Sequence, residues 1–71
     1  MDLRQQVLLF VNLQMVDVAT TEKKVELFIK RTRSTRETYF GWLTKWQQLD
    51  AISDHDERVK QLMDWSSWWT H

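Results

Sequence analysis

Residues 31–46 read RTRSTRETYFGWLTKW, and this stretch decides how the rest of the chain is expected to fold. Its first six positions hold three arginines, and aromatic residues follow at helical spacing. Ser34 and Glu37 have the spacing of a capping box, in which the serine hydroxyl and the glutamate carboxylate each accept from a main-chain N–H at a helix start. The stretch therefore predicts the end of one helix, a short turn and the start of another.

The helix that starts in this stretch is predicted to be amphipathic. Its apolar residues recur every three or four positions, as Tyr39, Trp42, Leu43, Trp46 and Leu49. Such spacing places all of them on one side of an α-helix. Gly41 lies within this helix at a cost of about 1 kcal/mol relative to alanine, so we expect another segment to pack closely there.

Three further helices are predicted, two before this helix and one after it. The first covers about residues 3–16, with an apolar face of Leu3, Val7, Leu8, Val11, Gln14 and Met15 that Leu9, Phe10 and Leu13 widen. The second starts with Thr20 or Thr21 as its N-cap and presents Val25, Phe28, Ile29 and Thr32. The last opens with Asp54-His55-Asp56-Glu57 and carries Val59, Leu62, Met63, Ser66 and Trp69 on its core side.

The first segment and the composition together indicate the fold class. Residues 8–16, LLFVNLQMV, also alternate as a strand would, but the long apolar run with no hairpin turn after it favours a helix. One glycine, no proline and no cysteine leave few tight turns and no disulfide. The predicted fold is all-α: one domain over residues 1–71, a compact bundle of three to four short helices with a helix-turn-helix-like central pair. Because so short a chain buries only about 60% of its unfolded surface, we expect a homodimer.

Charge is balanced over the whole chain but not along it. Lysine plus arginine and aspartate plus glutamate each number ten, which argues against a purely electrostatic nucleic-acid binder. Residues 23–36, called here the basic segment, contain six cations and one acid. Residues 50–64, the acidic segment, contain five acids and two cations. The two segments predict a dipolar surface, suited to steering a partner or to pairing with a second copy.

The segment Val25–Trp46 has the layout of a helix-turn-helix unit, which places its second helix in the major groove of DNA. Side chains at the start of that helix would reach base edges, and the basic residues beside it would bind phosphate. In this interpretation the base-reading residues are Thr35, Arg36 and Glu37. The phosphate-binding residues are Arg31, Arg33, Arg36 and Lys45.

The run TRETYFGWLTKW resembles the pattern S-R-x-T-Y-Y-x-W-L of the recognition helix in small phage and mobile-element helix-turn-helix regulators. The resemblance covers residues 25–46, 22 of the 71, and implies DNA binding and gene regulation. It implies that Phe40, Gly41 and Thr44 lie along the groove, and that Tyr39, Trp42 and Leu43 face the core.

The chain departs from this family pattern at two places. Arg33 and Ser34 occupy the turn, where a glycine is usual, and Phe28 and Ile29 occupy the first helix, where a small residue is usual. A looser similarity is to the helical arm-binding domain of tyrosine recombinases, which also contacts DNA. The catalytic domain of those recombinases has no counterpart in these residues.

Two other interpretations of these features stay open. A capped amphipathic helix follows another one in many small bundles that have no role in DNA binding. Trp65, Trp68 and Trp69 share one side of the last helix, so they either dock into the chain's own core or form a protein interface, where tryptophan is a frequent anchor. The alternative function is therefore a protein–protein inhibitor or antirepressor that blocks a host or phage protein through these tryptophans and the acidic segment.

The sequence predicts neither catalysis nor a cofactor. It has no glycine-rich phosphate loop, and neither His55 nor His71 stands at motif spacing from a serine or threonine. We expect no metal site at residues 54–57, because adjacent residues at a helix start point in different directions. The apolar run ending at Val16 is far shorter than the roughly 20 residues that span a bilayer, and no signal peptide is visible. We therefore expect a cytoplasmic protein without membrane contact.

Overall fold

The helices predicted from the sequence are all present in the computed structural model, which describes residues 2–69. Within these residues the elements are α1 (Leu3–Gln14), α2 (Thr21–Thr32), α3 (Arg36–Gln48), the 3-10 turn η1 (Leu49–Ala51) and α4 (His55–Trp69). None of the described residues forms a strand, so the all-α prediction is confirmed and the strand alternative for residues 8–16 is wrong.

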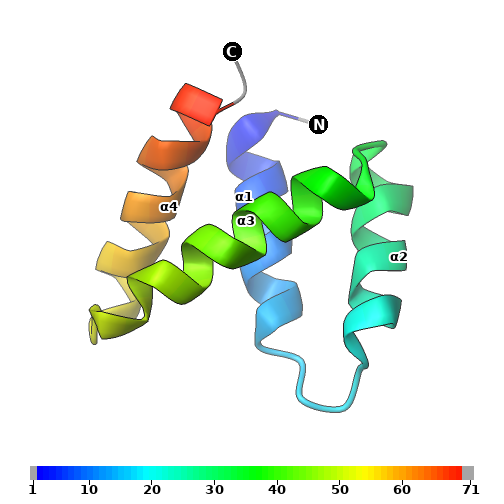
Figure 1. Cartoon of the computed structure of the whole chain (residues 1–71), viewed down its shortest axis with the longest axis horizontal. Helices are drawn as coiled ribbons and strands as arrows, with labels where there is room; N and C mark the ends of the chain where they lie inside the picture. The colour runs from blue at the N-terminus through cyan, green and yellow to red at the C-terminus, as the bar shows by residue number, and fades with distance from the viewer. Residues whose placement is uncertain (1, 70–71) are drawn as a thin grey trace.

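Helix α1 lies between α2 and α4, and α3 crosses in front of α1 on its way from the end of α2 to the start of α4 (Figure 1). Each α-helix begins at a side chain that accepts a hydrogen bond from a main-chain N–H of the first turn, which satisfies one of the N–H groups left without a helical partner. The four capping residues are Asp2, Thr20, Thr35 and Asp54. Of the two candidates predicted for the cap of α2, Thr20 takes the position, and the cap predicted at Asp54 is confirmed.

The cap of α3 differs from the prediction by one residue. Thr35, not Ser34, takes the N-cap position, and its Oγ1 accepts from the N–H of Thr38 at 3.2 Å. Because the cap is shifted by one residue, the third position of the helix is Thr38 and not Glu37. Oγ1 of Thr38 lies 3.1 Å from the Thr35 hydroxyl. The main chain of Ser34 instead donates to Oγ1 of Thr32.

The turn between α2 and α3 is made by Arg33 in a left-handed conformation, with φ 58° and ψ 24°. Its N–H donates to the carbonyl of Ile29 at 2.8 Å and so satisfies one of the last carbonyls of α2. A residue with a Cβ pays roughly 1 kcal/mol in this conformation, which is why glycine is usual there. The chain therefore changes direction abruptly, and α3 crosses α2 instead of continuing it (Figure 1).

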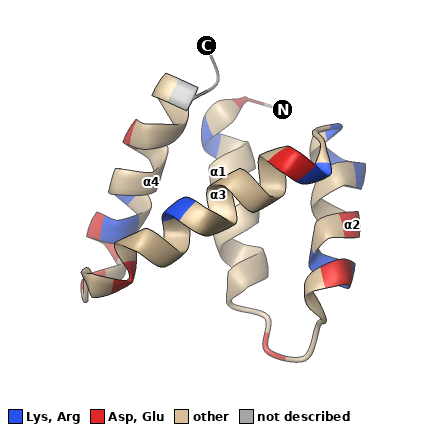
Figure 2. Ribbon diagram, in the orientation of Figure 1, with Lys and Arg blue, Asp and Glu red and all other residues tan. Residues whose placement is uncertain are grey.

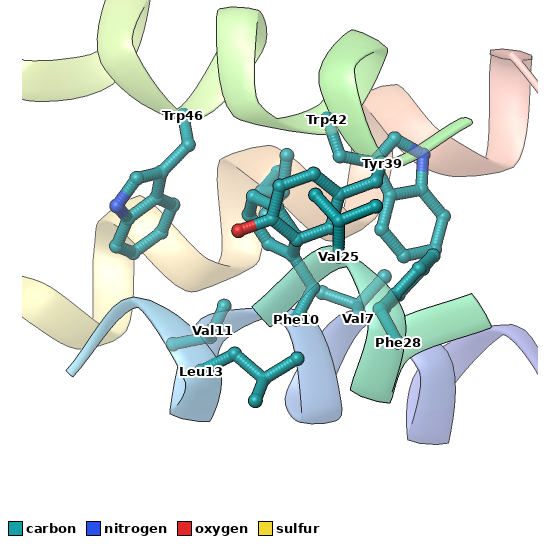
Figure 3. Packing of buried hydrophobic residues seen from close by; sticks show 10 residues of the cluster. Val7, Phe10, Val11, Leu13, Val25, Phe28, Tyr39, Trp42 and Trp46 are labelled. Carbon is teal, nitrogen blue, oxygen red and sulfur yellow. The ribbon is translucent and has the colours of Figure 1, made fainter. Parts of the chain in front are cut away.

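The core draws on all four helices within the described residues and is built around aromatic rings from α1, α2 and α3. Phe10 of α1 stands at its centre, with ring centroids 5.3 Å from Tyr39 and 5.9 Å from Trp42 (Figure 3). Phe28 of α2 approaches Trp42 at 5.4 Å, and all these rings meet edge to face. The predicted apolar side of α3 is confirmed, because Tyr39, Trp42 and Trp46 are buried and Leu43 and Leu49 are half-buried.

Helix α1 buries most of its predicted apolar face, but Leu8 and Met15 are left out of it. Val7, Phe10 and Val11 are buried, but Leu8 is 40% exposed and Met15 is 55% exposed. Apolar residues surround most of this helix, so the sequence alone does not show that Leu8 and Met15 stay exposed. Contacts with α2, α4 and the rings of α3 decide this, and Leu8 lies on the side that they leave uncovered.

The corner between α3 and α4 is held by Arg58 of α4. Its Nη2 donates to the carbonyl of Trp46 near the end of α3, and its guanidinium carbon lies 3.7 Å from the centroid of the Trp46 rings. Nη2 also lies 3.8 Å from a carboxylate oxygen of Asp50 in η1. Arg58 therefore stabilises the C-terminal end of α3, where carbonyls lack helical partners.

Candidate nucleic-acid interface

The solvent side of α3, called here the outer face, is formed by Arg36, Glu37, Phe40, Thr44, Gln47 and Gln48, all of which are exposed. They lie opposite the buried rings of Tyr39, Trp42 and Trp46, because positions three, four and seven apart share a helix side. Arg36 and Glu37 carry the only charges on this face, at its start. The face therefore offers hydroxyl and amide groups and one aromatic ring over the remaining turns.

The cations predicted to bind phosphate differ in their surroundings. Arg31 in the last turn of α2 and Arg33 in the turn are exposed, as is Lys30 beside them. Among residues 2–69, none of these three side chains forms an ion pair. Figure 2 shows the concentration of blue residues on α2 and the turn after it. These cations are therefore available to a partner at the end of the molecule where α3 begins.

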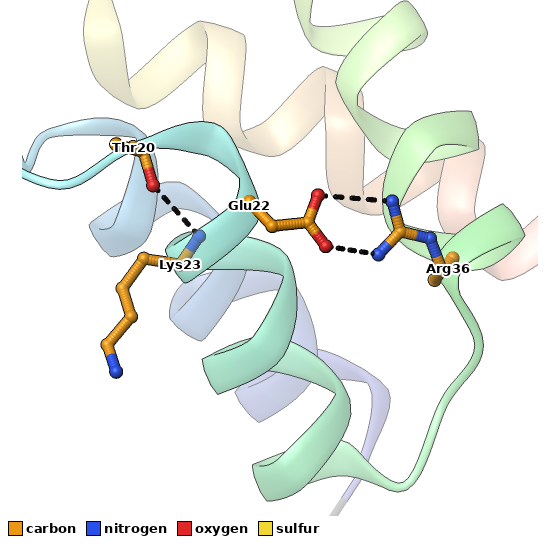
Figure 4. A network of polar contacts seen from close by, with 4 residues as sticks. All are labelled: Thr20, Glu22, Lys23 and Arg36. Carbon is orange, nitrogen blue, oxygen red and sulfur yellow. Dashed lines mark hydrogen bonds and ion pairs between the residues drawn. The ribbon is translucent and has the colours of Figure 1, made fainter.

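Arg36 is engaged within the chain. Its Nη1 donates to Oε1 of Glu22 at 2.7 Å and its Nη2 to Oε2 at 3.2 Å, which joins the first residue of α3 to the first turn of α2 (Figure 4). These hydrogen bonds, and then the charge of Arg36, lower the pKa of the Glu22 carboxyl; the same contacts raise the pKa of Arg36. The Arg36 guanidinium also lies 5.7 Å from the centroid of the Phe40 ring.

Lys45 lies apart from the arginines. It is nine residues beyond Arg36, or about 14 Å along the helix. Its Nζ stands 5.9 Å from the ring centroid of Trp65 in α4, and the side chain is half-buried. Lys45 therefore belongs to the contact between α3 and α4, not to the outer face.

Glu37 and Thr44 lie on the outer face, whereas Thr35 lies just before α3 as its N-cap. The hydroxyl of Thr35 caps the helix, and that of Thr44 donates to the carbonyl of Phe40 at 2.9 Å. Both threonines are exposed, and the Thr44 hydroxyl, which donates to Phe40, can still accept a hydrogen bond from solvent. Glu37 is exposed in the first turn, where the helix dipole favours an acid.

The C-terminal tryptophans do not form one exposed cluster. Trp65 is half-buried and packs on the core, whereas Trp68 is 80% exposed. The side chain of Trp69, which was predicted both for the core and for an interface, lies outside the described residues. Trp68 is thus the one described tryptophan that is offered mainly to solvent.

The acidic segment lies at the opposite end of α3 from the exposed arginines (Figure 2). Asp50, Asp54, Asp56 and Glu57 are all exposed there, around η1 and the start of α4. Asp54 has a structural role, because its Oδ1 accepts from the N–H groups of Asp56 and Glu57. Within residues 2–69, no three His, Cys, Asp or Glu side chains gather closely enough to hold a metal ion.

Sequence reasoning missed Glu22 as the partner of Arg36, since it stands 14 positions away and no local spacing connects the two residues.

No pocket opens among the described residues, and no helix of residues 2–69 is long and apolar enough to cross a membrane. Comparison of the chain with protein-family models, with curated proteins and with solved structures gave no match. The geometry and charges of the described residues therefore carry the functional inference.

Proposed function

We propose that this chain is a small non-enzymatic regulatory protein of the phage or mobile-element type that binds duplex DNA in the cytoplasm. The observation that carries the proposal is the abrupt turn at Arg33, which ends α2 and leaves the outer face of α3 exposed beside two exposed arginines, Arg31 and Arg33. This arrangement supports insertion of α3 into the major groove, where a helix fits and base edges are exposed.

In this proposal one group of residues binds phosphates and another contacts the bases. Arg31 and Arg33 neutralise phosphates on the strand beside the turn, which orients the protein on the duplex. The outer face supplies the base contacts: hydroxyls and amides bond to base edges, and the Phe40 ring contacts a thymine methyl group. The logarithm of the binding constant falls with the logarithm of the salt concentration by about 0.9 for each neutralised phosphate. Because few cations take part, the total slope is small.

The experiment measures binding to a labelled short duplex by fluorescence anisotropy at low salt. The test variant combines Arg31→Ala with Arg33→Gly, because glycine relieves the left-handed conformation and so preserves the fold. We expect binding about tenfold weaker than that of the unmodified protein. Lys60→Ala is the control, since Lys60 is an exposed cation on α4, away from α3's outer face. Equal affinities of the double variant and the control would remove the proposed function.

Trp68 favours a second candidate, a protein–protein inhibitor or antirepressor. An indole that is 80% exposed is a typical anchor for a protein interface, and the exposed acidic segment supplies nucleic-acid-like charge. In this case the protein binds a DNA-binding protein and not DNA itself. Trp68→Ala would then lose the partner in a pull-down, whereas the arginine double variant would keep it. Retention of the partner by Trp68→Ala would exclude this candidate.

A further inference from the structure

The carboxylate of Glu22 occupies the place where an anion would meet Arg36. Both oxygens face the two terminal nitrogens of the guanidinium, at 2.7 and 3.2 Å. This paired geometry is the one in which arginine binds a phosphate group or the edge of a guanine. The terminal edge of Arg36 is therefore already used in the free protein, although Arg36 stands at the head of the outer face.

We propose that Glu22 is a negative determinant of nucleic-acid binding: it holds Arg36 in the free protein and yields it to a backbone phosphate of the bound duplex. This inference rests on the proposed function and adds a step to it. The carboxylate takes the place of the phosphate in the free protein. An anion therefore binds at this site only if it binds Arg36 more tightly than Glu22 does. Nonspecific binding is weakened as a result.

The pair is placed where exchange is possible. The side chains of Glu22 and Arg36 are 61% and 51% exposed, so water and salt screen their attraction. An incoming phosphate reaches the guanidinium without any movement of the core, because the pair lies on the surface where α3 begins.

Both partners keep a favourable environment after they separate. Glu22 lies in the first turn of α2, where the helix dipole stabilises a carboxylate. Arg36 retains its position over the Phe40 ring, which directs the guanidinium along the outer face. At the first position of α3 the cation faces the positive end of the helix dipole, so a neighbouring anion, either Glu22 or a phosphate, is favourable to it.

The test compares Glu22→Gln with Glu26→Gln in binding to the same labelled duplex over a range of salt concentrations. Both variants remove one negative charge from α2, but Glu26 forms no hydrogen bond or ion pair among the described residues. We expect Glu22→Gln to bind about two- to fivefold more tightly than Glu26→Gln. We also expect this gain to shrink as the salt concentration rises, because salt screens the attraction between Glu22 and Arg36 that the gain comes from removing.

A second pair of variants keeps the test independent of folding and of total charge. Glu22→Asp keeps the charge but withdraws the carboxylate from Arg36, so its affinity should lie between those of the unmodified protein and Glu22→Gln. Adding Arg36→Ala to Glu22→Gln should abolish the gain. Equal affinities and slopes for Glu22→Gln and Glu26→Gln, or a gain that survives Arg36→Ala, would overturn the inference and leave the DNA-binding proposal standing. Absence of DNA binding by every variant would remove both.

Discussion

Nε2 of Gln14 donates a hydrogen bond of 2.9 Å to Oη of Tyr39, and this bond joins α1 to α3 at the edge of an aromatic core. The same nitrogen also donates to the carbonyl of Phe10 at 3.2 Å. The polar end of a buried tyrosine is thereby satisfied by a side chain that the sequence pattern had assigned to the apolar side of α1. The bond makes Tyr39 a sensitive site for testing the fold.

Replacing Tyr39 by phenylalanine should lower the free energy of unfolding by about 1 kcal/mol. The ring keeps its packing, but one hydrogen bond is lost, and Gln14 retains its bond to Phe10. Urea unfolding followed by circular dichroism measures the change. Unchanged stability of Tyr39→Phe would show that the bond contributes nothing.

Alkaline pH should destabilise the fold through the same residue. Burial raises the pKa of Tyr39 above the ordinary value of 10.0 for a tyrosine, while the hydrogen bond from Gln14 opposes this rise. Because the folded state holds the neutral phenol, the stabilisation is complete below the unfolded pKa and is lost as pH rises toward the folded one. The chain has one tyrosine, so ultraviolet absorbance of the phenolate reports this group alone. Titration at or below the ordinary pKa would contradict the expectation.

Thr35→Ala should cost about 1 kcal/mol of stability, because it removes the hydroxyl that accepts from the N–H of Thr38. Ser34→Ala is the matched control, since the Ser34 hydroxyl forms no hydrogen bond among the described residues. Its effect should be within about 0.5 kcal/mol. Thermal unfolding of the two variants measures both changes. A larger loss for Ser34→Ala would place the cap at Ser34, as the capping-box spacing had predicted.

Arg58→Ala should cost about 2 kcal/mol. The variant loses a charged hydrogen bond to the carbonyl of Trp46 and the stacking of the guanidinium on its ring. Lys60→Ala, an exposed cation on the same helix, should change stability by less than about 0.5 kcal/mol. Denaturant unfolding measures the difference between the two. Equal stabilities would mean that Arg58 does not hold the corner between α3 and α4.

Acid should weaken the link between α2 and α3. The pKa of Glu22 is lowered in the folded state, so its stabilising effect is present above the ordinary carboxyl pKa and is lost as pH falls through the folded value. The stability difference between the unmodified protein and Glu22→Gln should therefore be positive near neutral pH and shrink in acid. Unfolding measured across that range tests this. A difference independent of pH would contradict the ion pair as its source.

Local features of the structure followed from the sequence. The spacing of Tyr39, Trp42 and Trp46 predicted the buried side of α3, because one helix period relates them whatever the neighbouring helices are. The caps at Thr20 and Asp54 were equally local, since a cap needs only a short polar side chain next to a free N–H. At α3, Ser34 and Thr35 are adjacent candidates, and the backbone conformation of the turn chose between them.

The candidate site was predicted only in part. Arg31 and Arg33 are exposed as expected, because a helix end and a turn leave long cations in solvent. Arg36 and Lys45 were expected to be available, but Glu22 pairs with one and Trp65 lies under the other. Both contacts cross between helices, and no spacing along the chain signals them.

By itself, the sequence determined which stretches of the chain are helical, which side of α2 and α3 is buried, and that the fold is all-α, because these depend on neighbours within a few residues. Only the tertiary structure decided that Leu8 and Met15 of α1 stay exposed and which cations are paired. The physical reason is distance: Glu22 meets Arg36, and Arg58 meets Trp46, only after the crossing of the helices brings together groups that are far apart in the chain.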